Sequence, residues 1–233
     1  MNFELTEQQA AIQETARNFA QTELQPGVLE RDANSEISGR SLIRKMGELG
    51  LIGLPYPKEV GGQGADYLSY VLAVEEISKV DASVGISYSV STSLYGGSIM
   101  NSDAPVEKKN EFLAPVLSGQ HFGSFGLTEP NAGSDAGGCV TVAEKDGDEY
   151  ILNGMKCFNT NGPLADYTAV YALTELRKSK GTRSCFVVKK ELPDFMWASG
   201  RQDRSTVPHR FRDDPGKCTG AGRKYDRSFR RRI

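Results

Sequence analysis

The sequence predicts an α+β protein in which an all-α N-terminal domain is followed by an antiparallel β domain. Two observations support this class. Apolar residues recur at helical spacing through the first 120 residues, whereas after Gly119 short runs of β-forming residues alternate with turn signals. The chain has 233 residues, of which 38% are hydrophobic, so it can bury the cores of two modest domains.

The N-terminal region opens on a capping box, because Thr6 is followed three residues later by Gln9. Behind this box the apolar spacing predicts an amphipathic helix that runs until Pro26. A second helix is predicted over 41–49, where Gly50 ends it. The beginning of the chain is therefore helical.

Three more helices are predicted in the same region. Tyr67 begins a helical pattern of apolar residues, and Asp81 has the side chain of an N-cap for the next helix. Pro105 fits the first turn of a last helix, and Gly119 fits its end. We accordingly expect the first domain over residues 1–120.

The β region contains two strong turn signals, Asp146-Gly147 and Asn153-Gly154, and each predicts a hairpin. The runs "DYTAVYALT" (166–174) and "RSCFVVKK" (183–190) predict further strands. We expect this second, partial β domain over residues 121–195.

Beyond Phe195 the sequence has neither the helical nor the strand period. The segment 196–233 is dense in Arg, Asp, Gly and Pro and poor in aliphatic residues, so we expect an Arg-rich tail that is disordered or poorly packed. Tyr225 and Phe229 lie among its arginines, which leaves open a basic tail that binds nucleic acid or an acidic partner.

Composition excludes several classes of protein. The cysteines are far apart and there are only two histidines, so neither a zinc site nor a disulfide framework is expected. No basic region followed by an apolar run opens the chain, and no apolar run approaches the ~18 residues of a membrane span. We therefore expect free thiols, no metal, no membrane partner and a cytoplasmic location. The four cysteines are Cys139, Cys157, Cys185 and Cys218.

The stretch "GLTEPNAGSDAGG" (Gly126 to Gly138) is a candidate ligand-binding loop. Its glycines let the backbone turn sharply and approach a flat or anionic ligand, and Thr128 and Ser134 supply hydroxyl groups. Successive exposed N–H groups in such a turn can bind an anion. Composition alone is also compatible with an ordinary loop between two domains.

The order of residues in this stretch resembles the first signature of the acyl-CoA dehydrogenase family. A second match is "NGMKCFNTNG" (153–162), where the family has a strand with an aromatic residue and a threonine beside the flavin. The runs "LTEQQAAIQETARNFAQTELQP" and "LGLIGLPYPKEVGGQGADYLSYVLAVEEI" also resemble the family's N-terminal helical domain. The resemblance covers about Leu5 to Phe195.

The resemblance implies FAD as the cofactor. Ser134 would lie between the flavin and the CoA part of the substrate, so it is expected to bind both. Phe158 would be the aromatic residue beside the flavin ring, and Thr160 would place its hydroxyl near the redox-active nitrogen. From the residues alone, a core-facing Phe158 and a Thr160 that is merely a β-former are equally compatible. The expected cofactor-binding residues are Phe125, Leu127, Thr128, Ser134, Phe158, Asn159 and Thr160.

Three polar residues of the two motifs need a separate interpretation. Asn159 stands where the family usually has an apolar residue, and strand alternation would point it into the β core. An unpaired amide there would cost about 1–3 kcal/mol. Glu129 and Asp135 invite interpretation as an acid/base pair, but the resemblance implies that they hold the loop through backbone hydrogen bonds.

The resemblance also implies an activity. Members desaturate an acyl-CoA to the trans-2-enoyl-CoA and pass the electrons to an electron-transfer flavoprotein, and we expect a short or medium acyl chain. The family's catalytic glutamate lies in a C-terminal helical bundle that also forms much of the homotetramer interface. We expect this bundle to be absent, and with it any catalytic residue, so that the chain is a truncated dehydrogenase that is inactive alone.

An out-of-frame end would account for the tail. No nucleic-acid partner is expected on this interpretation. Two non-enzymatic alternatives remain, a fragment that binds FAD or acyl-CoA without turnover and an interaction protein with a basic tail.

Overall fold

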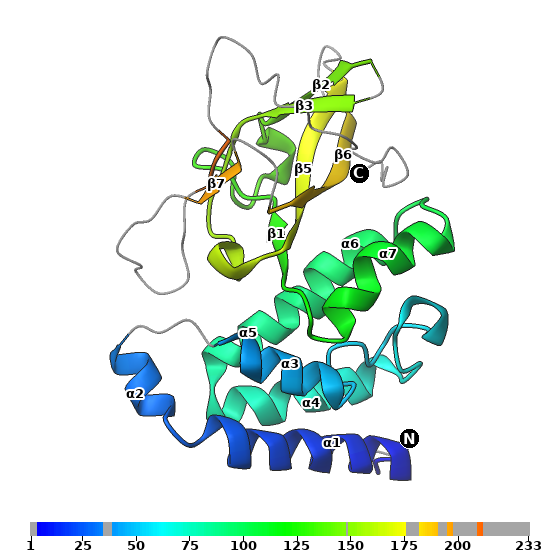
Figure 1. Cartoon of the computed structure of the whole chain (residues 1–233), viewed down its shortest axis with the longest axis vertical. Coiled ribbons are helices and arrows are strands. Elements are labelled where there is room, and N and C mark those ends of the chain that lie inside the picture. Colours follow the sequence, from blue (N-terminus) through cyan, green and yellow to red (C-terminus); the bar gives the residue numbers. More distant parts are fainter. Residues whose placement is uncertain are drawn as a thin grey trace. The chain divides into compact units, whose positions relative to one another are not determined.

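The computed structural model describes residues 4–34, 39–147, 149–175, 182–190, 195–197 and 209–211. The chain divides into two compact units. The first comprises Met1–Ser93 and Lys109–His121 and is helical, and the second comprises Leu94–Lys108 and Phe122–Ile233 and contains the strands (Figure 1). The predicted α+β class, with a helical region before a β region, is confirmed.

The helices appear where the capping residues predict them. The Thr6 hydroxyl accepts from the Gln9 N–H at 3.2 Å, and the Gln9 side chain accepts from the Thr6 N–H at 2.9 Å, which completes the predicted capping box. Asp66 caps the helix that begins at Tyr67, and Asp81 caps the helix that begins at Ala82. The short helices α2 and α6 and two π-helical turns were not predicted. The elements are α1 Glu7–Phe19, π-helical Ala20–Leu24, α2 Val28–Ala33, α3 Arg40–Glu48, α4 Tyr67–Val80, α5 Ala82–Ser89, π-helical Val90–Gly96, α6 Gly97–Met100 and α7 Val106–Leu117.

A buried carboxylate on α4 holds α1 in place. Glu76 accepts from Arg17 Nε and Nη2, both at 3.2 Å, and from Gln13 Nε2 at 3.1 Å. Lys79 Nζ adds a further contact at 3.1 Å. The hydrogen bonds from Arg17, more than any other contact, hold the pKa of Glu76 below its ordinary value although burial opposes them. The packing of α1 on α4 therefore depends on an ionised Glu76.

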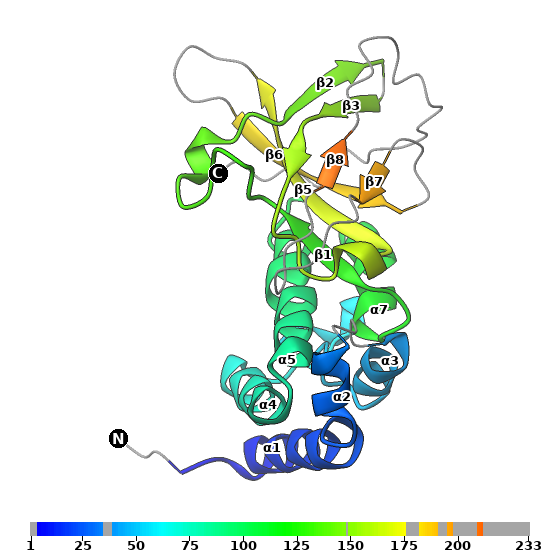
Figure 2. The same cartoon turned by 90° about the vertical axis from the view of Figure 1, so that its left-hand side faces the viewer.

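The strands of the second unit form two sheets (Figure 2). The larger has the order β1-β5-β2-β3, with β6 also paired to β5, and the smaller has the order β4-β8-β7. The core of the larger sheet is a cluster of side chains from β2, β3, β5 and β6, in which the ring centroids of Tyr150 and Phe186 lie 5.2 Å apart. The strands are β1 Gly123–Gly126, β2 Val142–Asp146, β3 Glu149–Asn153, β4 Met155–Lys156, β5 Tyr167–Glu175, β6 Thr182–Lys189, β7 Phe195–Trp197 and β8 His209–Phe211.

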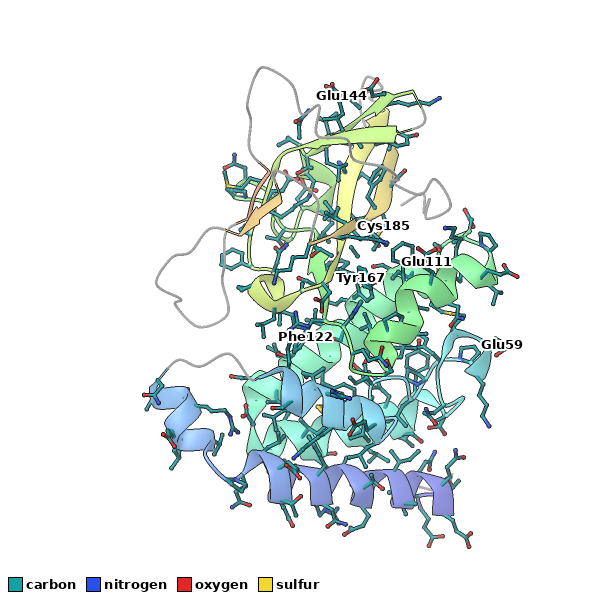
Figure 3. All side chains as sticks on the ribbon, in the orientation of Figure 1. Glu59, Glu111, Phe122, Glu144, Tyr167 and Cys185 are labelled. Atoms are coloured by element: carbon teal, nitrogen blue, oxygen red, sulfur yellow. The ribbon has the colours of Figure 1, made fainter. Side chains whose placement is uncertain are left out.

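The larger sheet is mixed rather than purely antiparallel, which corrects the predicted β domain. β5 and β6 pair antiparallel, as do β2 and β3, but β1 runs parallel to β5 with Gly123 opposite Tyr167. Tyr167, labelled in Figure 3, donates its N–H to the Phe122 carbonyl at 3.1 Å. Parallel pairing needs a long connection, and the segment between β1 and β5 supplies one.

One of the two predicted hairpins is wrong. β2 and β3 form the hairpin predicted at Asp146-Gly147, where Gly147 has a φ of 57°. After Asn153, however, the chain does not return along β3, because β4 pairs with β8 instead. A Cβ on Gly154 would lie 2.3 Å from Thr141 Oγ1. The glycine is therefore needed for close packing rather than for a two-residue turn.

Two short strands lie at or beyond the expected end of the β domain. Phe195–Trp197 forms β7 and His209–Phe211 forms β8, whereas we expected a tail without regular structure over 196–233. Strands of three residues are too short to show an alternating pattern, so the sequence does not reveal them. The rest of the expected tail lies outside the described residues.

Within the described ranges, Cys139, Cys157 and Cys185 are free thiols. The same ranges contain no group of three or more His, Cys, Asp or Glu side chains that could hold a metal ion. None of the helices described is both long enough and apolar enough to cross a membrane. Cys218 lies outside the described residues.

Replacing Glu76 with alanine should lower the free energy of unfolding by about 1–2 kcal/mol, because α1 loses its anchoring hydrogen bonds. The loss stays in this range because Arg17 is partly exposed and water can solvate its guanidinium group. Urea denaturation followed by circular dichroism would measure this loss. Glu75→Ala is the matched control, since Glu75 is 52% exposed and pairs with Lys79 at the surface. Equal losses in the two variants would contradict the assigned role of Glu76.

Candidate functional site

The two sequence motifs lie side by side in the second unit. The first motif begins at the last residue of β1, and the second begins at the last residue of β3 and contains β4. The Cys157 N–H donates to the Thr128 carbonyl at 2.9 Å, and the Ser124 hydroxyl donates to the Thr160 carbonyl at 2.8 Å. The structure therefore brings two groups of predicted cofactor-binding residues together. These are Phe125 of β1 with Leu127 and Thr128 of the first motif, and Phe158, Asn159 and Thr160 of the second motif.

A buried ion pair joins the motifs beneath this surface. Lys156 is fully buried, and its Nζ lies 2.7 Å from Glu129 Oε1 and 3.1 Å from the Leu127 carbonyl oxygen. The other oxygen of Glu129 accepts from the Val140 N–H at 2.6 Å, and Oε1 also accepts from the Thr141 N–H at 2.9 Å. The predicted scaffold role of Glu129 is confirmed. Sequence reasoning missed Lys156, because lysine is rarely buried and its position in a predicted strand gave no sign of burial.

Glu129 is held in its ionised form. Burial raises the pKa of this carboxyl group, but the hydrogen bonds from Lys156, Thr141 and Val140 outweigh burial and lower the pKa below its ordinary value. A carboxylate that is buried, saturated with donors and ionised is poorly placed to take or give a proton. The geometry therefore argues against Glu129 as a catalytic acid or base.

Asp135 lies at the start of the 3-10 turn Ala136–Gly138. Its carbonyl oxygen accepts from the Gly138 N–H at 2.9 Å, but its carboxylate makes no capping hydrogen bond to the turn, contrary to expectation. A Cβ on Gly137 or Gly138 would lie about 3 Å from the Asp135 carboxylate oxygens. The two glycines let the backbone pass close to this side chain.

A cavity of about 260 Å³ opens beside the first motif. Its lining is mainly apolar, and the rings of Phe125 and Tyr171 meet edge to face with centroids 5.5 Å apart. Arg183 brings a guanidinium group to the cavity and donates to the Gly137 carbonyl. Sequence reasoning missed Tyr171 and Arg183, because both lie within predicted strands whose pattern indicates only packing. The lining residues are Phe125, Leu127, Ala136, Gly137, Tyr171 and Arg183.

The second motif is in strand conformation at Asn153, the end of β3, and at Met155–Lys156, whereas residues 157–161 lie in neither a helix nor a strand. Phe158 has a φ of 58° and is 60% exposed, so the core-facing alternative is wrong. Thr160 lies in a turn, so the alternative that it is only a β-former is wrong too. A left-handed backbone at a phenylalanine is strained, and such strain is typical of functional segments.

Asn159 is 3% exposed, and among the described residues its Oδ1 has no hydrogen-bond partner. Its Nδ2 lies 3.1 Å from the position that a Cβ on Gly126 would take. The expected buried, unpaired amide is therefore present, although the residue is buried in an irregular segment rather than by strand alternation. Leaving the carbonyl unpaired costs about 1–3 kcal/mol.

Several donors of the site have no partner within the described ranges. They are the N–H and hydroxyl of the half-buried Thr128 and the hydroxyls of Thr160 and Ser134. None of these three residues lines the cavity, but hydrogen-bond donors without partners suit the polar edge of a flat ligand. The residues present therefore fit an isoalloxazine ring.

The chain belongs to the acyl-CoA dehydrogenase family. The family model described as "Acyl-CoA dehydrogenase, N-terminal domain" matches residues 6–120, and "Acyl-CoA dehydrogenase, middle domain" matches residues 124–212. The second match extends beyond Phe195, where we expected the resemblance to end. The strand β8 lies within this additional part.

Individual relatives agree with this family. The short-chain specific acyl-CoA dehydrogenase of Clostridium acetobutylicum is 41% identical over 197 residues, which are 84% of this chain and 51% of the relative. The structure of butyryl-CoA dehydrogenase from Megasphaera elsdenii gives a TM-score of 0.83 at 39% identity and covers 91% of this chain and 57% of that one.

A structure with bound flavin is also similar. Glutaryl-CoA dehydrogenase from Mycobacterium smegmatis in complex with FADH2 gives a TM-score of 0.81 at 33% identity, covering 90% of this chain and 53% of that one. The chain thus spans about half the length of the relatives it matches.

Because Glu129 is ionised and paired in the folded state, the free energy of unfolding should depend on pH. Because the folded pKa of Glu129 lies below its ordinary value of 4.5, its contribution is complete above that pH and is lost as the pH falls through the folded pKa. The free energy of unfolding should therefore fall less steeply below pH 4.5 in Glu129→Gln than in the wild type. Urea denaturation between pH 7 and pH 3 measures both slopes, and parallel slopes would refute the prediction.

Replacing Asn159 with leucine should raise the free energy of unfolding by about 1 kcal/mol, because a volume-matched apolar side chain removes the unpaired amide. Asn161→Leu is the matched comparison. It should destabilise the chain by about 1–3 kcal/mol, because Asn161 donates to the Gly123 carbonyl and has a φ of 65°. Thermal and urea unfolding would rank the two variants, and a destabilised Asn159→Leu would overturn the assignment.

Proposed function

We propose that this chain forms the flavin-binding part of an FAD-dependent acyl-CoA dehydrogenase that desaturates short or medium acyl-CoA. The observation that carries the proposal is the juxtaposition of the two motifs, joined by Lys156 and Glu129, with unpaired donors at Thr128 and Thr160. The family assignment and the similarity to butyryl-CoA dehydrogenase support the reaction and the chain length.

FAD, when bound, accepts the hydride that leaves the β-carbon of the acyl chain. In this proposal the Thr128 N–H and hydroxyl bind the pyrimidine edge of the ring, and the Thr160 hydroxyl binds near its redox-active nitrogen. Donors already aimed at positions where negative charge develops stabilise reduction without reorganisation.

The remaining site residues shape the surroundings of the ring. Phe158 covers one edge of the ring and excludes water, which explains an exposed aromatic side chain on a strained backbone. Phe125 and Leu127 form the apolar wall, Asn159 belongs to the segment that contacts the ring, and Ser134 hydrogen-bonds between the flavin and the CoA part of the substrate.

Desaturation also removes a proton from the α-carbon of the acyl chain. A group other than Glu129 must take this proton, because the Glu129 carboxylate is buried and paired with Lys156. We place the general base in the half of the family's length that the matched residues do not reach. These 233 residues, tested as they stand, should bind FAD without turnover. Assembly into homotetramers, electron transfer to an electron-transfer flavoprotein and a cytoplasmic location belong to the same proposal.

We propose a division into an N-terminal domain over 1–120, a partial middle domain over 121–195 and a tail over 196–233. The family matches over 6–120 and 124–212 support the boundary near residue 120, and the second match runs past residue 195.

Titration of the purified chain with FAD tests the cofactor directly. Thr128→Val removes one hydroxyl donor, so the dissociation constant for FAD should rise about 2- to 10-fold. Thr22→Val is the matched control, because the Thr22 hydroxyl is exposed and bonds to Asn18 within its own helical turn. A wild-type chain that binds no FAD, or equal affinities for wild type and Thr128→Val, would contradict the proposed site.

Addition of butyryl-CoA to the FAD-loaded chain without oxygen tests the assignment of the base. The flavin should keep its visible absorbance, because we place the general base outside these residues and without it the acyl-CoA cannot reduce the flavin. Bleaching would place the general base within the 233 residues and overturn that part of the proposal.

A further inference from the structure

The carbonyl oxygen of Leu127 receives two buried side-chain donors. Lys156 Nζ lies 3.1 Å from it, and Cys139 Sγ lies 3.3 Å from it. Lys156 is fully buried and Cys139 is 3% exposed. Burial raises the pKa of the Cys139 thiol, which keeps its proton on sulfur as a donor. The Leu127 carbonyl oxygen therefore accepts two hydrogen bonds from buried side chains, and one of these donors is a cation.

The other end of the same peptide group is the N–H of Thr128. A donor on a carbonyl oxygen draws electron density from the amide nitrogen, and the N–H becomes a stronger donor in turn. A charged donor has a larger effect than a neutral one. Within the described residues the Thr128 N–H has no partner, so the strengthened donor is available to a ligand.

We propose that Lys156 is a positioning residue that polarises the Leu127–Thr128 peptide, so that the Thr128 N–H stabilises the negative charge of the reduced flavin. The inference rests on the proposed function, in which the ring binds at Thr128. It assigns the buried lysine a role in the electronics of the site in addition to its role in stability. The scaffold pair and the redox properties of the cofactor would then be linked through a single peptide group.

A buried ammonium group has three donors, and Lys156 directs them to Glu129 Oε1 and to the Leu127 carbonyl oxygen. Glu129 has three donors besides Lys156, namely the N–H and hydroxyl of Thr141 and the N–H of Val140. Lys156 nevertheless lies on the second motif with its ammonium group directed to both Glu129 and the backbone of the first motif. This placement delivers a positive charge to the Leu127 carbonyl at a site closed to water.

The first test needs no flavin. In chains labelled with 15N-threonine, the wild type is compared with the double variant Glu129→Gln/Lys156→Met, because either single change would leave one buried charge unpaired. The double variant removes both buried charges together and keeps the volumes of the two side chains. The Thr128 amide proton should move upfield in the double variant, while the Thr160 amide proton stays in place.

Cys139→Ala is a milder variant that leaves the ion pair intact. It should move the Thr128 amide proton in the same direction by a smaller amount. Unmoved Thr128 resonances in a folded double variant would overturn the proposal. Circular dichroism confirms that each variant is folded.

The second test uses the dissociation constants for oxidised and reduced FAD. The double variant should weaken binding of the reduced form about threefold more than that of the oxidised form, relative to the wild type. This ratio corresponds to a reduction potential lower by about 15 mV for a two-electron couple. A merely structural role would weaken both forms equally and leave the potential unchanged, which would refute the inference.

The two tests separate the inference from the proposed function. A wild-type chain that fails to bind FAD overturns the function and the flavin part of the inference, whereas the amide shift still decides whether Lys156 polarises the peptide. Binding with an unchanged potential overturns the inference and leaves the proposed function standing.

Discussion

The ion pair of Lys156 and Glu129 is the interaction on which the site depends. It joins two segments far apart in the sequence and lies entirely in the interior of the second unit. Removing one partner of such a pair leaves a buried charge and costs about 3–5 kcal/mol. The backbone that carries Leu127 and Thr128 is therefore held more firmly than a glycine-rich loop would be by itself. This firmness matters because a donor can be aimed at a ligand only from a fixed backbone.

Much of the helical unit follows from local rules. Capping residues such as Thr6, Asp66 and Asp81 determine where helices begin, and their effects act over three residues. The sequence therefore predicts these helices well. The mixed sheet does not follow from local rules, because the parallel pairing of β1 with β5 depends on contacts across a long connection. Gly154 illustrates the same limit. The dipeptide Asn153-Gly154 predicts a turn, whereas the structure needs the glycine for close packing against Thr141.

The site divides in the same way. Resemblance of the motifs predicts roles for Thr128, Phe158 and Thr160, and the structure shows the two segments in contact. The roles of Lys156 and Arg183 could not be predicted, because nothing in the sequence tells which polar group a strand residue will meet. Glu129 shows the value of geometry most clearly. Its position in a motif is compatible with catalysis, and only its four donors and its burial show that it is structural.

Unfavourable features concentrate in the few residues after β4. Phe158 and Asn161 have left-handed backbones, Phe158 exposes an aromatic ring and Asn159 buries an unpaired carbonyl. Each feature costs free energy, and none is needed for the packing of the strands. The ion pair and the hydrogen bonds that join this segment to β1 offset these costs and keep the conformation in place. A strained segment beside a saturated ion pair is typical of a functional site rather than of packing alone, and donors without partners beside an exposed aromatic ring support the proposal of a flavin site.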